Sequence, residues 1–110
     1  MALKKHWYHI LLALAEGPAH GAEIRRRVDK HTRGSLELYP AMLYGSLEDL
    51  LEKELVREVD EESGRPPGES DRYRYLNLTQ AGRKVLVAET EEYREVVRIA
   101  RDLLAGEGSQ

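Results

Sequence analysis

The sequence predicts a mainly α-helical fold with one small β-hairpin, and three observations carry this prediction. Three segments with helical spacing of apolar residues come first, at 6–16, 20–30 and 40–55. Two runs rich in β-formers, 55–59 and 72–78, enclose a stretch with glycine and proline at 61–70, as in a hairpin with a long polar tip. A heptad-like apolar stripe over 80–104 then predicts a closing helix about 38 Å long.

Local signals justify the ends of these elements. The first helix is apolar on most sides, which is typical of an enclosed helix, and it stops at Gly17-Pro18. Pro40 suits the first position of the third helix, where its fixed φ is favourable and its missing N–H is not needed. Thr79 is a good N-cap for the last helix.

The length of 110 residues predicts a single hydrophobic core. We expect a domain at 1–78, a dimerisation helix at 79–105 and a flexible tail at 106–110. A domain this small does not cover so long a helix, and its stripe therefore predicts contact with a second copy of the chain. The residues expected at that interface are Leu11, Tyr93, Val96, Val97, Ala100 and Leu104.

Several function classes are disfavoured by what the sequence lacks. There is no cysteine, which excludes disulfides, thiolate metal sites and cysteine nucleophiles. No glycine-rich phosphate loop and no Ser-His or carboxylate motif occurs, so we expect no enzyme and no cofactor. His6 and His9, three residues apart, are too few for a metal site. The apolar stretch at 10–15 is too short to span a bilayer, and residues 1–5 begin no recognisable signal peptide, so we expect a cytoplasmic protein.

The formal net charge of −3 argues weakly against nucleic-acid binding, but the charge is segregated along the chain. Residues 20–46 hold five basic and three acidic side chains, whereas residues 47–62 hold eight acidic and two basic ones. The basic surplus therefore falls on the second helix, and the acidic surplus begins within the third.

Three helices followed by a two-stranded wing are the order of a winged helix-turn-helix, whose third helix enters the major groove of DNA. The sequence also resembles the PadR family of transcriptional regulators. Three segments carry the resemblance: ILLALAEGPAHGAEI at 10–24, LYPAMLYGSL at 38–47 with LLEKELV at 50–56, and RYRYLNLTQAGR at 72–83. Together they cover nearly the whole chain in the family's order.

The resemblance implies a dimeric regulator, usually a repressor, of the short subfamily with a single C-terminal helix. It implies sequence-specific binding to a double-stranded operator, and some members of that subfamily bind flat aromatic compounds at the dimer centre. Residues expected at DNA are Tyr39, Ala41, Met42, Tyr44, Gly45 and Ser46 on the third helix, with Arg65, Arg72 and Arg74 on the wing. An aromatic effector would meet Trp7, Tyr8 and Tyr93.

The sequence departs from the family's pattern in the recognition helix. Tyr39 stands where serine or glycine is usual, Met42 where threonine is frequent, and Glu48 and Asp49 where basic residues are common. A carboxylate facing the groove accepts a hydrogen bond from cytosine N4, but it also repels the phosphates. The alternative hypothesis is therefore a winged-helix interaction module that has lost DNA binding and meets a basic protein partner.

Further alternatives concern single residues. The wing arginines can pair with the acidic residues at 60–62 instead of with phosphate, and Trp7 and Tyr8 can fill a core instead of lining a pocket.

Overall fold

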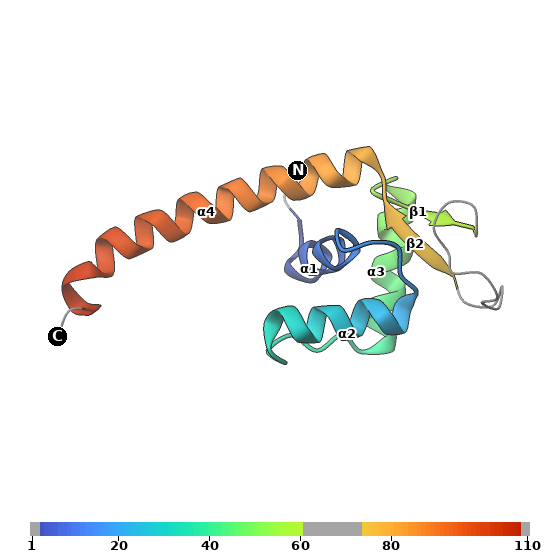
Figure 1. The fold of residues 1–110 in the computed structure, drawn as a ribbon, viewed down its shortest axis with the longest axis horizontal. Helices are drawn as coiled ribbons and strands as arrows, with labels where there is room; N and C mark the ends of the chain where they lie inside the picture. Colours follow the sequence, from blue (N-terminus) through green and yellow to red (C-terminus); the bar gives the residue numbers. More distant parts are fainter. Residues whose placement is uncertain (1–2, 61–73, 109–110) are drawn as a thin grey trace.

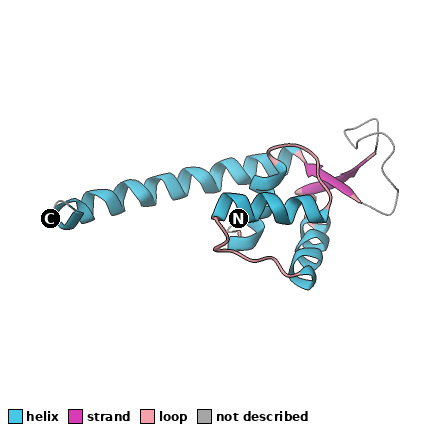
Figure 2. Cartoon of the chain, turned by 60° about the horizontal axis from the view of Figure 1, so that its bottom comes forward, coloured by secondary structure: helices cyan, strands magenta, loops and turns pink. Residues whose placement is uncertain are grey.

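A computed structural model describes residues 3–60 and 74–108 of the chain and confirms the predicted fold class (Figure 1). The two strands pair antiparallel, from Val56 opposite Leu78 to Val59 opposite Tyr75. Figure 2 shows the three short helices gathered beside this hairpin, with the long helix running past them. The elements are α1 (Lys5–Leu14), α2 (Gly21–Thr32), α3 (Pro40–Glu52), β1 (Val56–Val59), β2 (Tyr75–Leu78) and α4 (Gln80–Gly108).

Several element boundaries differ from the prediction, among them the ends of α3 and α4. Helix α3 ends at Glu52, three residues before the expected Leu55, because Glu54 adopts a φ of 60° and turns the chain. The N–H of Leu55 then donates to the Leu50 carbonyl at 3.0 Å, which closes the helix end. At the other end of the chain, α4 continues to Gly108, where a tail from 106 onward was expected.

The core lies where α1, α2, α3 and the hairpin converge. Its fully buried side chains include Ile10, Leu14, Ile24, Leu43 and Leu50. Helix α1 packs against α2, α3, α4 and β2, which explains why its sequence is apolar on most sides. The prediction that Leu11 lies at a dimer interface is wrong, because Leu11 is 0% exposed within its own protomer and has no surface left for a second chain.

The connection between α1 and α2 joins the wing through an isolated β-bridge between Ala19 and Leu76. Ala19 donates to the Leu76 carbonyl at 3.0 Å, and Leu76 donates back to the Ala19 carbonyl at 2.9 Å. These two bonds fix the hairpin to the helices, so the wing is held at a defined distance from α3.

Arg27 of α2 secures the same connection from the other side. Its Nη1 donates to the carbonyls of Ala13 and Gly17, at 3.1 and 2.8 Å, and its Nε donates to Glu23 at 3.0 Å. The guanidinium thus gives the Ala13 carbonyl a second donor beside the Glu16 N–H, and it bonds the Gly17 carbonyl in the turn that follows α1. Arg27 is therefore a structural residue.

Helix α4 begins in close contact with the end of α3. Thr79 is its N-cap, as predicted, since its Oγ1 accepts from the Gly82 N–H at 2.9 Å. Thr79 also donates from Oγ1 to the Glu54 carbonyl at 2.7 Å and from its N–H to the Leu55 carbonyl at 3.2 Å. A Cβ built on Gly82 would lie 2.0 Å from the Leu55 oxygen, so only glycine allows this approach.

The first half of α4 packs on the domain and the second half projects from it. Tyr8 bonds Thr90 through its hydroxyl at 2.7 Å and meets the Tyr93 ring edge-to-face at 4.9 Å. Figure 1 shows α4 extending well past the other helices, and the molecule measures 56 × 26 × 23 Å. Neither α4 nor any other helix within 3–60 and 74–108 combines the length and apolar character needed to cross a membrane.

Candidate nucleic-acid interface

Helix α3 presents one exposed face. Ala41, Gly45, Glu48 and Glu52 follow one another at spacings of three or four residues, which places them on one side of a helix. All four are exposed, as are Tyr39 and Met42. Ser46 is only 4% exposed and lies on the buried side with Leu43 and Leu47, so the prediction that Ser46 reaches DNA is wrong.

Tyr44 is exposed but braced against the start of α2. Its side chain is 56% exposed, and its Oη lies only 3.0 Å from where a Cβ on Gly21 would stand. Around it, His20, Gly21, Ala22, Tyr44, Leu47, Arg74 and Leu76 line a hollow of about 130 Å³. The tyrosine hydroxyl therefore has a fixed place where α2, α3 and the wing meet.

Arg74, at the start of β2, joins the wing to α3. Its Nη1 donates to Glu48 at 2.6 Å and its Nε to Glu58 at 3.1 Å, and these bonds to the two carboxylates raise the pKa of the guanidinium. As an alternative to phosphate, the sequence offers the acidic residues at 60–62 as partners of the wing arginines; the partners of Arg74 are Glu48 and Glu58, and residues 61–62 lie outside the described part of the chain. Arg65 and Arg72, also predicted to contact DNA, lie outside the described residues.

The three arginines of α2 differ in their surroundings. Arg26 pairs with Glu23, and Arg27 is turned into the fold. Arg25 has no ion pair among residues 3–60 and 74–108 and lines a cleft of about 350 Å³ between α2 and the segment that leads to α3. Tyr39 lines the same cleft and donates its hydroxyl to Glu37 at 2.7 Å, a bond that raises the pKa of Tyr39.

A family model of PadR-like transcriptional regulators matches residues 10–88, most of the chain and all of the surface described so far. The chain belongs to the PadR-like family. The family is one of winged-helix transcriptional regulators, which supports a DNA-binding role for the matched residues.

A curated relative is an uncharacterised 37.1 kDa protein from a transposon of Streptomyces fradiae. It is 38% identical over 80 residues, which are 73% of this chain and 20% of the relative. The chain thus spans only one fifth of that relative's length.

Solved structures support the same fold. A PadR-like transcription factor of Bacteroides fragilis shares 23% identity at a TM-score of 0.68, over 89% of this chain and 88% of that one. RosR of H. salinarum shares 23% at a TM-score of 0.64, over 94% and 96%. F93 from STIV, a winged-helix DNA-binding protein, shares 20% at a TM-score of 0.68, over 88% and 96%.

In this PadR-like chain, the residues expected to bind an aromatic effector do not form one pocket. Trp7 and Tyr8 are buried in the protomer, and Trp7 is flanked by the Lys4 and Lys53 ammonium groups at 4.8 and 5.7 Å from its ring. Packing against their own chain leaves both side chains less than a tenth exposed, and their role in an effector site at the dimer centre stays a prediction. Tyr93 alone of the three lines a groove.

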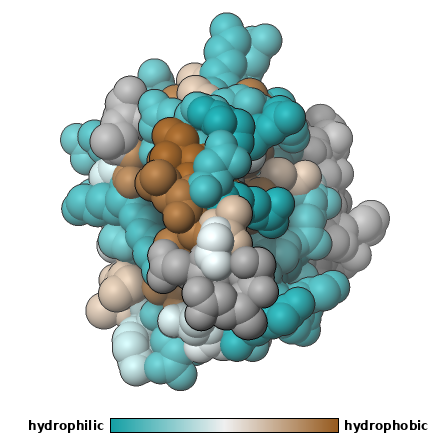
Figure 3. Space-filling view, turned by 90° about the vertical axis from the view of Figure 1, so that its left-hand side faces the viewer, coloured by the Kyte–Doolittle hydropathy of each residue, from teal (hydrophilic) through white to brown (hydrophobic). Residues whose placement is uncertain are grey.

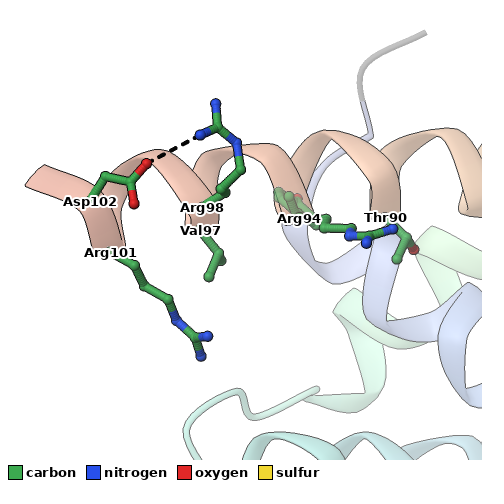
Figure 4. Close-up of a pocket in the computed structure, with 7 residues that line it drawn as sticks. Thr90, Arg94, Val97, Arg98, Arg101 and Asp102 are labelled. Atoms are coloured by element: carbon green, nitrogen blue, oxygen red, sulfur yellow. Dashed lines mark hydrogen bonds and ion pairs between the residues drawn. The ribbon is translucent and has the colours of Figure 1, made fainter.

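That groove, of about 520 Å³, lies along the projecting half of α4 (Figure 4). Val97 and Arg101 point from the same side of the helix, whereas Arg98 points away and pairs with Asp102 at 3.2 Å. The lining residues are Thr90, Tyr93, Arg94, Val97, Arg98, Arg101 and Asp102.

The projecting half of α4 also exposes a set of large apolar side chains. Figure 3 shows an apolar strip, coloured brown, between hydrophilic flanks on the face seen from this end of the molecule. Val96 is 61% exposed and Leu103 75%, while Ala100 is half-buried. The exposed apolar residues are Tyr93, Val96, Val97, Ile99, Leu103 and Leu104.

No group of three or more possible metal ligands occurs within the described part of the chain. Burial, followed by a neighbouring lysine, lowers the pKa of both His6 and His9, which favours neutral imidazoles.

Proposed function

We propose that the chain is a homodimeric repressor that binds a double-stranded operator sequence-specifically through α3 and the wing. The observation that carries this proposal is the exposed, uncharged first half of α3, where Tyr44 is braced against α2 beside the Arg74 guanidinium. A recognition helix reads base edges with its N-terminal residues, and this half of α3 is free to do so. Because its target is genomic DNA, such a regulator would work in the cytoplasm.

The roles of the exposed residues follow from their size and chemistry. Ala41 and Gly45 are small, and outside the adjoining backbone of α3 no described atom lies within 4 Å of a Cβ built on Gly45, so the backbone can approach the bases closely. Tyr44 and Tyr39 carry hydroxyls suited to phosphate oxygens, and Arg74 adds a charge. Met42 is exposed beside them and is suited to apolar contact.

The exposed apolar side of α4 supports dimerisation. Large apolar side chains gathered on one face usually mark an interface, and the strip extends beyond the surface that the rest of the chain covers. A second copy would cover it by antiparallel packing of the two α4 helices. The two recognition helices would then address half-sites about 34 Å apart or a multiple of this.

Substitution of Val97 by aspartate tests the dimer. We expect the variant to be monomeric at concentrations where the parent protein is dimeric, as measured by analytical ultracentrifugation, because a carboxylate would be buried in an apolar interface. Lys84→Asp, an exposed change in the part of α4 before this strip, is the matched control. A dimer that survives Val97→Asp would exclude this face as the interface.

DNA binding is tested by selecting bound sequences from random duplexes and then titrating salt. We expect an enriched two-fold-related site, an affinity that falls steeply with salt, and weaker binding by Tyr44→Ala in a protein that remains folded. Absence of binding at low salt would refute the operator proposal and favour the interaction module with a basic partner.

An aromatic effector at the dimer centre is the remaining part of the proposal. Its support is the groove in which Tyr93 and Val97 lie, next to the strip that a second copy would cover. Titration of flat aromatic compounds into the dimer by calorimetry tests it, and Tyr93→Ala should weaken any binding found. Equal binding by that variant would exclude this groove.

A further inference from the structure

Glu48 holds a particular position on the exposed face of α3. The face begins with the small residues Ala41 and Gly45, and Glu48 follows about one turn after Gly45. Its side chain is 63% exposed. It is therefore the first long side chain on this line of the helix, and it would meet base edges if α3 enters the groove.

The carboxylate of Glu48 is oriented by the wing. Arg74 donates from Nη1 to Oε1 of Glu48 at 2.6 Å, while the bond from its Nε to Glu58 at 3.1 Å fixes the guanidinium on β1. Within residues 3–60 and 74–108, Oε2 of Glu48 has no hydrogen-bond partner. One oxygen is thus held by the wing and the other remains as an acceptor.

The ion pair also weakens the main objection to an acid at DNA, although Arg74 divides its single charge between Glu48 and Glu58. An isolated carboxylate would be repelled by the phosphates, but the Arg74 charge lies directly against this one. Asp49 and Glu52, the neighbouring acids, have no ion pair in the described part of the chain. Glu48 is therefore distinguished from them by its orientation and by its ion pair with Arg74.

We propose that Glu48 reads a cytosine of the operator in the major groove, and that Arg74 is the positioning residue that holds its carboxylate. An ionised carboxylate only accepts hydrogen bonds, and the cytosine N4 amino group is the donor with which Glu and Asp pair. This inference rests on the proposed DNA binding through α3. It adds the identity of one base in each half-site and the residue that selects it.

The test compares sequences selected from random duplex DNA by the parent protein and three variants. The parent should enrich cytosine at one position of each half-site, with a preference of roughly 5- to 100-fold over other bases. Glu48→Ala should lose this preference, and Glu48→Gln should move it towards adenine, which a glutamine side chain recognises. Glu52→Gln removes an acid one turn further along the same face and should leave the preference unchanged.

Arg74→Met tests the positioning role. The variant should weaken the cytosine preference at that one position more than it changes preferences elsewhere in the site, with an unchanged circular dichroism spectrum. Loss of affinity that is uniform across sequences would show that Arg74 only supplies charge, and would overturn its positioning role.

The outcomes separate this inference from the proposed function. If the parent binds a defined operator and Glu48→Ala keeps every base preference, Glu48 does not read a base and DNA binding still stands. If Glu48→Gln instead tightens binding to all duplexes alike, Glu48 merely competes with phosphate for Arg74, and the inference is wrong. If the parent binds no duplex, both proposals fail.

Discussion

Replacement of Gly82 by alanine is expected to destabilise the protein, although alanine is the better helix former. The Cβ of the variant would lie 2.0 Å from the Leu55 carbonyl oxygen and 3.0 Å from its carbon, and the first of these distances is not found in folded proteins. The start of α4 must therefore move away from the end of α3 by about 1 Å or more.

That displacement breaks the contacts that Thr79 makes. Its bonds to the Glu54 and Leu55 carbonyls, at 2.7 and 3.2 Å, would both be stretched out of range, at about 1 kcal/mol each. The strain of overpacking lowers the free energy of unfolding by about 1–3 kcal/mol more. The better helix propensity of alanine raises it by about 1 kcal/mol. We expect the free energy of unfolding to fall by about 2–4 kcal/mol.

Gly45→Ala is the matched control, because Gly45 also lies inside a helix. Outside the adjoining backbone of α3, nothing in the described chain stands within 4 Å of its added Cβ, so only the propensity gain of up to about 1 kcal/mol should remain. Urea unfolding followed by far-UV circular dichroism, at one protomer concentration for all variants, measures both changes. The reasoning is refuted if Gly82→Ala is as stable as the parent protein or if the two variants shift in the same direction.

Three further predictions concern stability. Glu54→Gly should stabilise the protein by about 1 kcal/mol in the same urea assay, because a φ of 60° is costly for a residue with a side chain; a destabilised variant would contradict this. Arg27→Met should lower the free energy of unfolding by about 2–4 kcal/mol, since two carbonyls and Glu23 lose their donor, and an unchanged urea midpoint would exclude this role. Because the folded state lowers the pKa of His6 and His9 from 6.5, the unfolded chain binds protons more readily, so stability should be complete above about pH 6.5 and decline as the pH falls below it. Urea midpoints measured across that range check the sign, and His9→Gln should flatten the decline.

The order of the elements was predictable because local signals mark their ends. Gly17-Pro18 stops α1, Pro40 begins α3 and Thr79 caps α4, each through chemistry that acts within a few residues. The end of α3 was not predictable, because Glu54 carries no signal of a left-handed conformation in its residue type.

The contacts that build the site join residues far apart in the chain, so periodicity could not reveal them. Arg74 and Glu48 are 26 residues apart, and which carboxylate an arginine meets depends on how the wing is set against α3. Leu11 illustrates the same limit. An apolar residue on a helix that is apolar on most sides predicts burial, but its sequence does not tell whether its own chain or a second copy covers it.

The charge gradient along α3 favours one orientation on DNA. Its first half around Tyr44 carries no acidic side chain, and the N-terminal end of a helix is the positive end of its dipole. The acids begin with Glu48, whose charge Arg74 partly offsets while also pairing with Glu58, whereas Asp49 and Glu52 have no ion pair among the described residues. If α3 enters the groove N-terminus first, that charge lies nearer the outer end of the helix, away from the bases. The opposite orientation, with the C-terminal end of α3 in the groove, would bring these acids nearest to the DNA and is therefore the more strongly repelled. A negatively charged recognition helix is thus compatible with DNA binding.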